Sequence, residues 1–212
     1  MGLQAAFDLL LASESALDGL DALIWQSLAA AATSAKHPWT NGCLTTISTI
    51  DGERPCPSSR TVVLRRCDVA ARTIDCHTDV RSSKVNELES RGGAVCWLFY
   101  HPSTKIQLRL QGSARVVNDK QADAEWESVN LLSRSAYLSV ETPGKAVSNP
   151  LPPSTEDRFV EQAESERGRE NFRLIRTQVE TVDWLYLRQG GHVRASLEYG
   201  GKGSVQESWL VP

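Results

Sequence analysis

Residues 77–88, HTDVRSSKVNEL, place hydroxyl groups, an arginine and a lysine just before and inside an expected helix. A strand is expected over 71–77 and the helix over 83–90, so the intervening turn could present backbone N–H groups and Lys84 to an anion. Because the N-terminal end of a helix dipole is positive, a lysine in the first turn is unfavourable unless an anion binds there. The same pattern also fits a serine-capped surface helix without any ligand.

A second basic segment, SSRTVVLRR at 58–66, places Arg60 at the start and Arg65 near the end of an expected strand. With Lys84, these arginines could clamp a phosphate, because guanidinium binds phosphate bidentately and an ammonium adds a point charge. Solvated charge at strand ends is the commoner explanation of such residues. The separation of Arg60 and Arg65 would also direct them to opposite faces of a regular strand, so a shared site requires a bulge or a position beyond the strand end.

Other kinds of chemistry have weaker support in the sequence. The histidines form no HExxH motif, no GxSxG elbow or phosphate-binding P-loop occurs, and the glycines of YGGKGS at 199–204 indicate a loop. The 5 cysteines include no CxxC pair, which argues against a disulfide framework or a zinc cluster and favours a reducing cytoplasm. A net charge of -3 argues against nucleic acid as a partner and favours a small molecule or a protein. The N-terminus has neither the basic flank of a signal peptide nor an uninterrupted apolar span, so a soluble protein is expected.

These residues must be positioned by a mainly β structure. Apolar residues at helical spacing over 3–32 predict a packing helix, broken near Gly19. From residue 43 the period changes to two, which predicts strands over 43–50, 61–67, 71–77, 94–100, 105–117, 181–187, 192–199 and 207–211. Further helices are expected over 119–133 and 154–171, the second capped by Ser154 or Thr155. Because strands follow one another in runs, we predict one domain over 1–212, with a helical segment at 1–35 and an antiparallel sheet or barrel with inserted helices over 43–212.

In this order, the segments resemble those of the pyridoxamine 5'-phosphate oxidase family. SRTVVLR is similar to the family's strand that opens with an arginine and ends with a basic residue, and HTDVRSSK is similar to its phosphate-binding turn. The resemblance implies an antiparallel FMN-binding split barrel, mainly β with flanking helices. It implies FMN contacts for Arg60, Arg65, Thr78, Ser82, Ser83 and Lys84.

Two later segments extend the resemblance. WLFYHPSTKIQLRLQG is similar to the family's strand with a glutamine five residues before a glycine, which implies that Gln107 binds the flavin ring. Gln107 also falls on the polar face of a strongly alternating strand. VDWLYLRQGGHVR resembles the family's C-terminal signature, which implies Trp184 beside the flavin and Arg194 near the substrate.

The chain departs from the family pattern at two places. Ser83 stands where the oxidases have an arginine, and Arg194 is followed by ASLE instead of continuing to a histidine and a second arginine. The flavin site is therefore better matched than the site for pyridoxamine phosphate. The resemblance implies an FMN-dependent oxidoreductase with an unidentified small-molecule substrate, and a homodimer with its flavin between two subunits. A non-catalytic flavin-binding or sensing module and a ligand-free structural domain remain open, because no catalytic acid or base can be identified.

Overall fold

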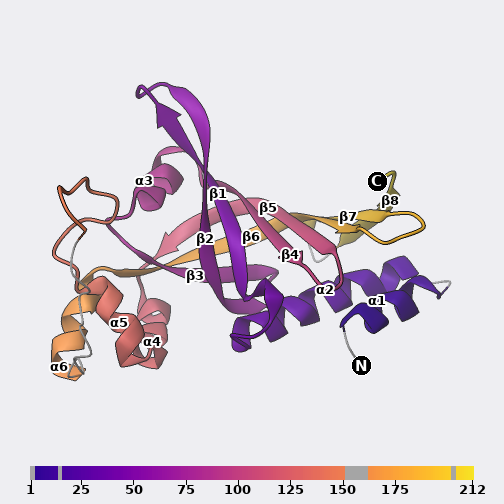
Figure 1. Ribbon diagram of the computed structural model, residues 1–212, viewed down its shortest axis with the longest axis horizontal. Coiled ribbons are helices and arrows are strands. Elements are labelled where there is room, and N and C mark those ends of the chain that lie inside the picture. The colour runs from indigo at the N-terminus through magenta and orange to yellow at the C-terminus, as the bar shows by residue number, and fades with distance from the viewer. Residues whose placement is uncertain (1–2, 14–15, 151–161, 202–203) are drawn as a thin grey trace.

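The computed structural model describes residues 3–13, 16–150, 162–201 and 204–212 (Figure 1). Within these ranges, 8 strands form one sheet in the order β3-β2-β1-β4-β5-β6-β7-β8. All neighbouring strands are antiparallel, and β3 also pairs with β6. This last pairing closes the strands from β3 to β6 into a barrel, and β7 and β8 continue the sheet beyond it. The predicted antiparallel split barrel is confirmed.

The strands of this sheet alternate with a few helices along the chain. The strands are β1 (Asn41–Ile50), β2 (Arg54–Asp68), β3 (Thr73–Asp79), β4 (Ala94–His101), β5 (Ile106–Val117), β6 (Phe172–Tyr186), β7 (Val193–Tyr199) and β8 (Val205–Leu210). The α-helices are α1 (Leu3–Leu11), α2 (Ala16–Thr33), α3 (Ser83–Ser90), α4 (Lys120–Ser128), α5 (Leu131–Arg134) and α6 (Gln162–Ser165). Short 3-10 helices are η1 (Pro38–Thr40), η2 (Ser135–Tyr137) and η3 (Glu166–Glu170).

The helices lie at two ends of the barrel. Figure 1 shows α1 and α2 near the ends of β4 and β5, and α4, α5 and α6 together at the opposite side. The main core fills the barrel and includes Trp25 of α2 and Trp97 of β4, both fully buried. A second, smaller core lies under α4, where Trp126 packs against Phe172 of β6. None of the helices in the described ranges is long and apolar enough to cross a membrane.

Three expectations about the elements need correction. The N-terminal helix does not break near Gly19, because α1 ends at Leu11 and α2 begins at Ala16. Gly19 lies within α2 at the contact between the two helices, where a Cβ atom would come within 2.6 Å of Leu10 Cδ1. The helix expected over 119–133 is two helices, because Asn130 starts α5 by accepting a hydrogen bond from Ser133 N.

The strand expected over 181–187 in fact begins at Phe172. Two arginines, Arg173 and Arg176, interrupt the apolar pattern of its first half, but Arg176 is paired with Asp75 on the neighbouring strand β3. The expected helix at 154–171 is present as α6 and η3 from Gln162 onward. Its expected cap, Ser154 or Thr155, falls outside the described residues.

Candidate functional site

The turn between β3 and α3 is organised around the ammonium group of Lys84. Ser82 is the N-cap of α3, but its side chain makes no capping hydrogen bond to the helix. Instead, Lys84 Nζ donates to Ser82 Oγ at 3.0 Å and to Thr78 Oγ1 at 3.1 Å. The structure therefore brings three of the predicted residues together, and it favours a cation-centred turn over a simple serine-capped helix.

Lys84 has an unusual electrostatic environment for a lysine. Burial lowers its pKa from the ordinary value and the nearby charge of Arg60 adds to this effect, whereas Cys76, Asp79 and Glu87 act in the opposite direction. No carboxylate among the described residues forms an ion pair with Lys84. Because an ammonium has three N–H donors and the two hydroxyls take two of them, one donor remains for another acceptor. The turn thus holds a partly buried positive charge that has no directly ion-paired carboxylate among the described residues.

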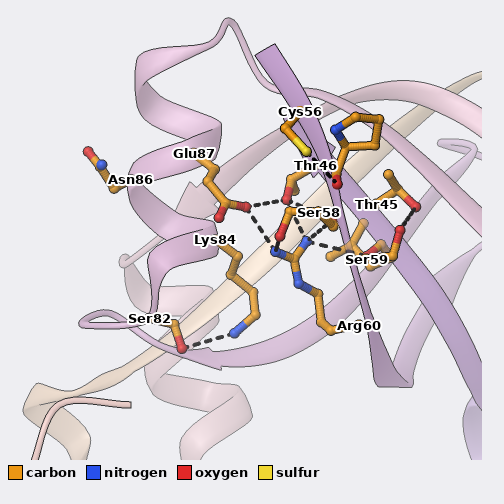
Figure 2. Close-up of polar contacts among 12 residues, drawn as sticks. Thr45, Thr46, Cys56, Ser58, Ser59, Arg60, Ser82, Lys84, Asn86 and Glu87 are labelled. Carbon is orange, nitrogen blue, oxygen red and sulfur yellow. Dashed lines mark hydrogen bonds and ion pairs between the residues drawn. The ribbon is translucent and has the colours of Figure 1, made fainter. Parts of the chain in front are cut away.

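Arg60 links β2 to α3 beside this turn (Figure 2). Its Nη2 lies 2.9 Å from Glu87 Oε2 and 2.9 Å from Ser58 Oγ, and its Nη1 donates to Ser58 O at 2.8 Å. The hydroxyl of Thr46 donates to Glu87 and accepts from Arg60. Both terminal nitrogens of Arg60 are therefore bonded to protein oxygens, and Nε is the group without a partner among the described residues.

The sequence interpretation missed Glu87, the buried acid that holds Arg60 in place. The sequence feature that could have identified Glu87 is its position three residues after Lys84, since residues at this spacing lie on the same side of a helix. Glu87 sits between Val85 and Leu88, both buried, so it faces the barrel with them. An acid on the buried face of a short helix indicates a partner on the element beneath.

Arg65 is the extra residue of a β-bulge. Leu64 pairs with Cys76 and Arg66 pairs with Asp75, so the register between β2 and β3 shifts at Arg65. A bulge of this kind was required for Arg60 and Arg65 to share a site. Burial raises the pKa of the Cys76 thiol to about 12, and the charges of Lys84, Arg60 and Arg65 act on the same thiol in the opposite direction.

The three predicted cations therefore act electrostatically on the same buried thiol. Ser83 is placed differently from its neighbours in the turn. It is exposed and lines a hollow of about 250 Å³ between α3 and the β1 strand, together with Asn86 and Ser48. Its hydroxyl makes no hydrogen bond to a described residue. Ser83 therefore has no polar side-chain contact that ties it to the Lys84 ammonium.

Gln107, Trp184 and Arg194 form a second group on β5, β6 and β7. Gln107 pairs with Leu185, and Leu185 pairs with Arg194, so these residues form one row across the sheet. Gln107 is half-buried and makes no side-chain hydrogen bond within the described residues. No hydrogen bond or ion pair among those residues joins this row to the Lys84 turn.

Trp184 lies on the other face of the sheet from that row, because neighbouring residues of a strand point to opposite faces. Its indole is fully buried, with its ring centroid 5.5 Å from that of Phe7 in α1, and its Nε1 has no hydrogen-bond partner among the described residues. Trp184 is thus a core residue, separated by the sheet from Gln107. The flavin contact implied by the resemblance remains a prediction for this residue.

Arg194 is bound to an acid that the sequence interpretation missed. Its Nε and Nη2 donate to Asp183 at 3.1 and 2.6 Å, and Arg109 also donates to Asp183. Burial alone would raise the pKa of Asp183, but the hydrogen bonds from Arg194 and Arg109 hold it below its ordinary value. Asp183 is therefore an anion placed between two arginines, and it neutralises much of the charge that Arg194 could offer a substrate.

The closed antiparallel barrel, with a cation-rich turn after β3, is the fold of the split-barrel proteins. Within this class, residues 22–118 match the family model described as pyridoxamine 5'-phosphate oxidase, FMN-binding domain. The predicted resemblance to the pyridoxamine 5'-phosphate oxidase-related FMN-binding proteins is confirmed by this match and by similar proteins. The matched segment contains the Lys84 turn and Gln107, and it ends before Trp184 and Arg194.

Individual relatives agree with this family match. The chain is 28% identical over 173 residues to pyridoxine/pyridoxamine 5'-phosphate oxidase 2 of Arabidopsis thaliana, covering 77% of this chain and 83% of that protein. A pyridoxamine 5'-phosphate oxidase-related, FMN binding protein of Nostoc punctiforme PCC 73102 has the same fold, with a TM-score of 0.66 at 21% identity over 90% of this chain and 96% of that one. PhzG of Burkholderia lata 383, solved in complex with tetrahydrophenazine-1-carboxylic acid, has a TM-score of 0.64 at 20% identity, covering 90% and 91% of the two chains.

Proposed function

We propose that this protein binds FMN and acts as an FMN-dependent oxidoreductase on a small-molecule substrate. The observation that carries the proposal is the environment of Lys84, a partly buried ammonium with two hydroxyl partners, no ion-paired carboxylate among the described residues and Arg60 beside it. Buried charges are normally paired, so an unpaired one indicates that a ligand supplies the counter-charge. A phosphate at the start of α3 would do so.

The donor set around this turn fits a phosphate group. Lys84 would supply the point charge, and the hydroxyl of Ser82, already oriented by Lys84, would donate to a phosphate oxygen. The buried hydroxyl of Thr78 donates to Asp79 O at 3.2 Å and accepts from Lys84, so it would hold the ammonium in position. Arg65 is exposed at its bulge and forms no ion pair with a described residue, so it is free to add a second cation. Arg60 would contribute through Nε, with Glu87 holding its guanidinium in position.

When bound, the flavin supplies a ring that accepts a hydride from the substrate, while the protein supplies orientation and electrostatics. Gln107 is the residue of this chain best suited to hydrogen-bond the ring, because its amide has no other partner among the described residues. Arg194 faces the same side of the sheet as Gln107, but Asp183 already occupies its donors. We therefore expect weak recognition of an anionic substrate such as pyridoxamine 5'-phosphate at this position.

The two groups of predicted residues also favour a homodimer. The Lys84 turn lies on β3 and α3, whereas Gln107 and Arg194 lie on β5 and β7, and no polar contact between described residues joins them. One flavin would contact both groups if its phosphate bound to one subunit and its ring lay against the other. This arrangement is implied by the family resemblance, and light scattering at micromolar concentration tests it. A monomer that binds FMN tightly would contradict it.

The experiment that tests the function compares FMN with riboflavin. Fluorescence titration of the purified protein should give tighter binding of FMN, because only FMN carries the phosphate. Equal affinity for the two flavins would refute the phosphate site. Oxygen consumption with pyridoxamine 5'-phosphate should be slow, and reduction of the bound flavin by NADH or NADPH should be tested in parallel.

A second candidate function is a flavin-binding or sensing module without turnover. It is favoured by the Arg194–Asp183 pair, which leaves the substrate side without a free cation at this position. Tight FMN binding with no reduction by either nicotinamide and no oxidation of candidate amines would favour this module over the oxidoreductase.

A further inference from the structure

A row of charged residues crosses four neighbouring strands away from the Lys84 turn. Its members stand directly opposite one another in the order Arg66, Asp75, Arg176 and Arg115, on β2, β3, β6 and β5. A parallel row on the same face consists of Asp68, Thr73, Gln178 and Ser113. Together with Gln121 at the start of α4, seven of these residues line a hollow of about 470 Å³. This volume is typical of small-molecule sites.

The acids near this hollow are already engaged. Asp75 is almost fully buried and accepts from Arg176 Nε at 2.9 Å and from Nη2 at 2.6 Å. Asp68 accepts from the backbone N–H of Ala71 at 2.9 Å, in the turn between β2 and β3. Glu125 of α4 forms its hydrogen bond with His77 at 2.9 Å, and this bond and the charge of Arg66 both lower the pKa of Glu125. Asp75 is therefore paired with Arg176, and neither Asp68 nor Glu125 forms an ion pair with Arg66 or Arg115.

Arg66 and Arg115 are these unpaired arginines. Both side chains are exposed, and neither forms a hydrogen bond or an ion pair with a described residue. Arg115 also stands directly opposite Arg176, whose guanidinium is paired with Asp75. The hydroxyls of Thr73 and Ser113, in the adjacent row, also have no hydrogen-bond partner among the described residues. The hollow thus combines two free guanidinium groups with two free hydroxyls.

We propose that this hollow is a second anion site, which binds the phosphate group of a small molecule. Two guanidiniums can each donate a pair of parallel hydrogen bonds to phosphate oxygens, and the hydroxyls of Thr73 and Ser113 complete the set of donors. The proposal uses none of the residues assigned to the flavin phosphate, so it does not depend on FMN binding.

The test is a titration with inorganic phosphate, followed by two-dimensional ¹H–¹⁵N NMR of the full chain. In the unmodified protein, the amides of Thr73 and Ser113 should shift and saturate, and glycerol should cause no such shift. A double variant with Arg66→Gln and Arg115→Gln should weaken this binding roughly tenfold or more, as expected for loss of two charge-assisted contacts. The matched control is Arg54→Gln, which removes an exposed arginine elsewhere on β2 and should leave the titration unchanged.

The same spectra separate the two sites. Amides of residues 82–84 report on the flavin-phosphate turn, so a failure of the FMN proposal would leave the readout at Thr73 and Ser113 intact. The second site is refuted if these two amides do not respond to phosphate. It is also refuted if they respond equally in the double variant, provided that circular dichroism shows the variant to be folded.

Discussion

Replacing Lys84 by methionine tests the flavin-phosphate site at its most informative residue. Methionine keeps an unbranched side chain of similar length, so the packing of the stem between β3 and α3 is largely retained. The variant removes the ammonium that bonds to Thr78 and Ser82. Because burial lowers the pKa of Lys84, the charged form is disfavoured in the folded protein, and removing the charge should not destabilise the ligand-free fold.

The expected loss of FMN affinity follows from one charge-assisted hydrogen bond. Such bonds contribute about 1.5–3 kcal/mol, which corresponds to a roughly 10- to 150-fold increase in the Kd for FMN. The affinity for riboflavin should hardly change, because riboflavin lacks the phosphate that Lys84 would contact. The ratio of the two affinities therefore isolates the phosphate contribution from any general loss of binding.

The assay is flavin fluorescence titration of both ligands, with thermal unfolding as a check on folding. The matched control is Lys145→Met, which removes an exposed lysine already paired with Glu141 at 2.6 Å and should leave both affinities unchanged. An unchanged Kd for FMN in the Lys84 variant would show that the phosphate lies elsewhere. A parallel loss for FMN and riboflavin would show that Lys84 supports the site without contacting phosphate.

Three further predictions concern charge in the fold and in the site. Burial lowers the pKa of Lys84, so the ammonium should lose its proton, and with it its attraction for phosphate, at a pH below the ordinary lysine pKa of 10.5. FMN affinity should therefore fall as the pH rises toward 10.5, whereas riboflavin affinity should not. An FMN affinity that stays constant up to pH 10.5 would contradict this prediction. Replacing Glu87 by glutamine should lower the free energy of unfolding by about 1.5–3 kcal/mol in denaturant titrations, since its arginine partner would keep only neutral acceptors, whereas the exposed Glu89→Gln on the same helix should have little effect. Burial lowers the pKa of His37 and of His101 below 6.5, so on acidification these histidines take up protons in the unfolded state before they do so in the folded state. Their contribution to the free energy of unfolding should therefore be present above pH 6.5 and should decline as the pH falls below it. An equally steep decline in a variant with both histidines changed to asparagine would assign the effect to other groups.

The sequence by itself determined the fold class and most of the elements. Period-two alternation with β-branched residues predicted part of each strand of the sheet, because such residues pack well on a half-buried pleated surface, but it missed the first halves of β2 and β6. The hydroxyls and lysine of HTDVRSSK, together with the arginine of the preceding strand, identified the cation-rich turn. These features are local, so they can be seen without knowing which strands are neighbours.

Only the tertiary structure decided how those residues are paired. Glu87 holds Arg60, Asp183 holds Arg194, and Trp184 lies in the core under α1. Each of these outcomes depends on the strand register, on where a helix lies or on which face of the sheet a side chain occupies. A register shift of one residue would have moved a strand's side chains to the opposite face of the sheet. Charges far apart along the chain meet only when the barrel closes, because β3 must pair with β6 before the row from Arg66 to Arg115 exists.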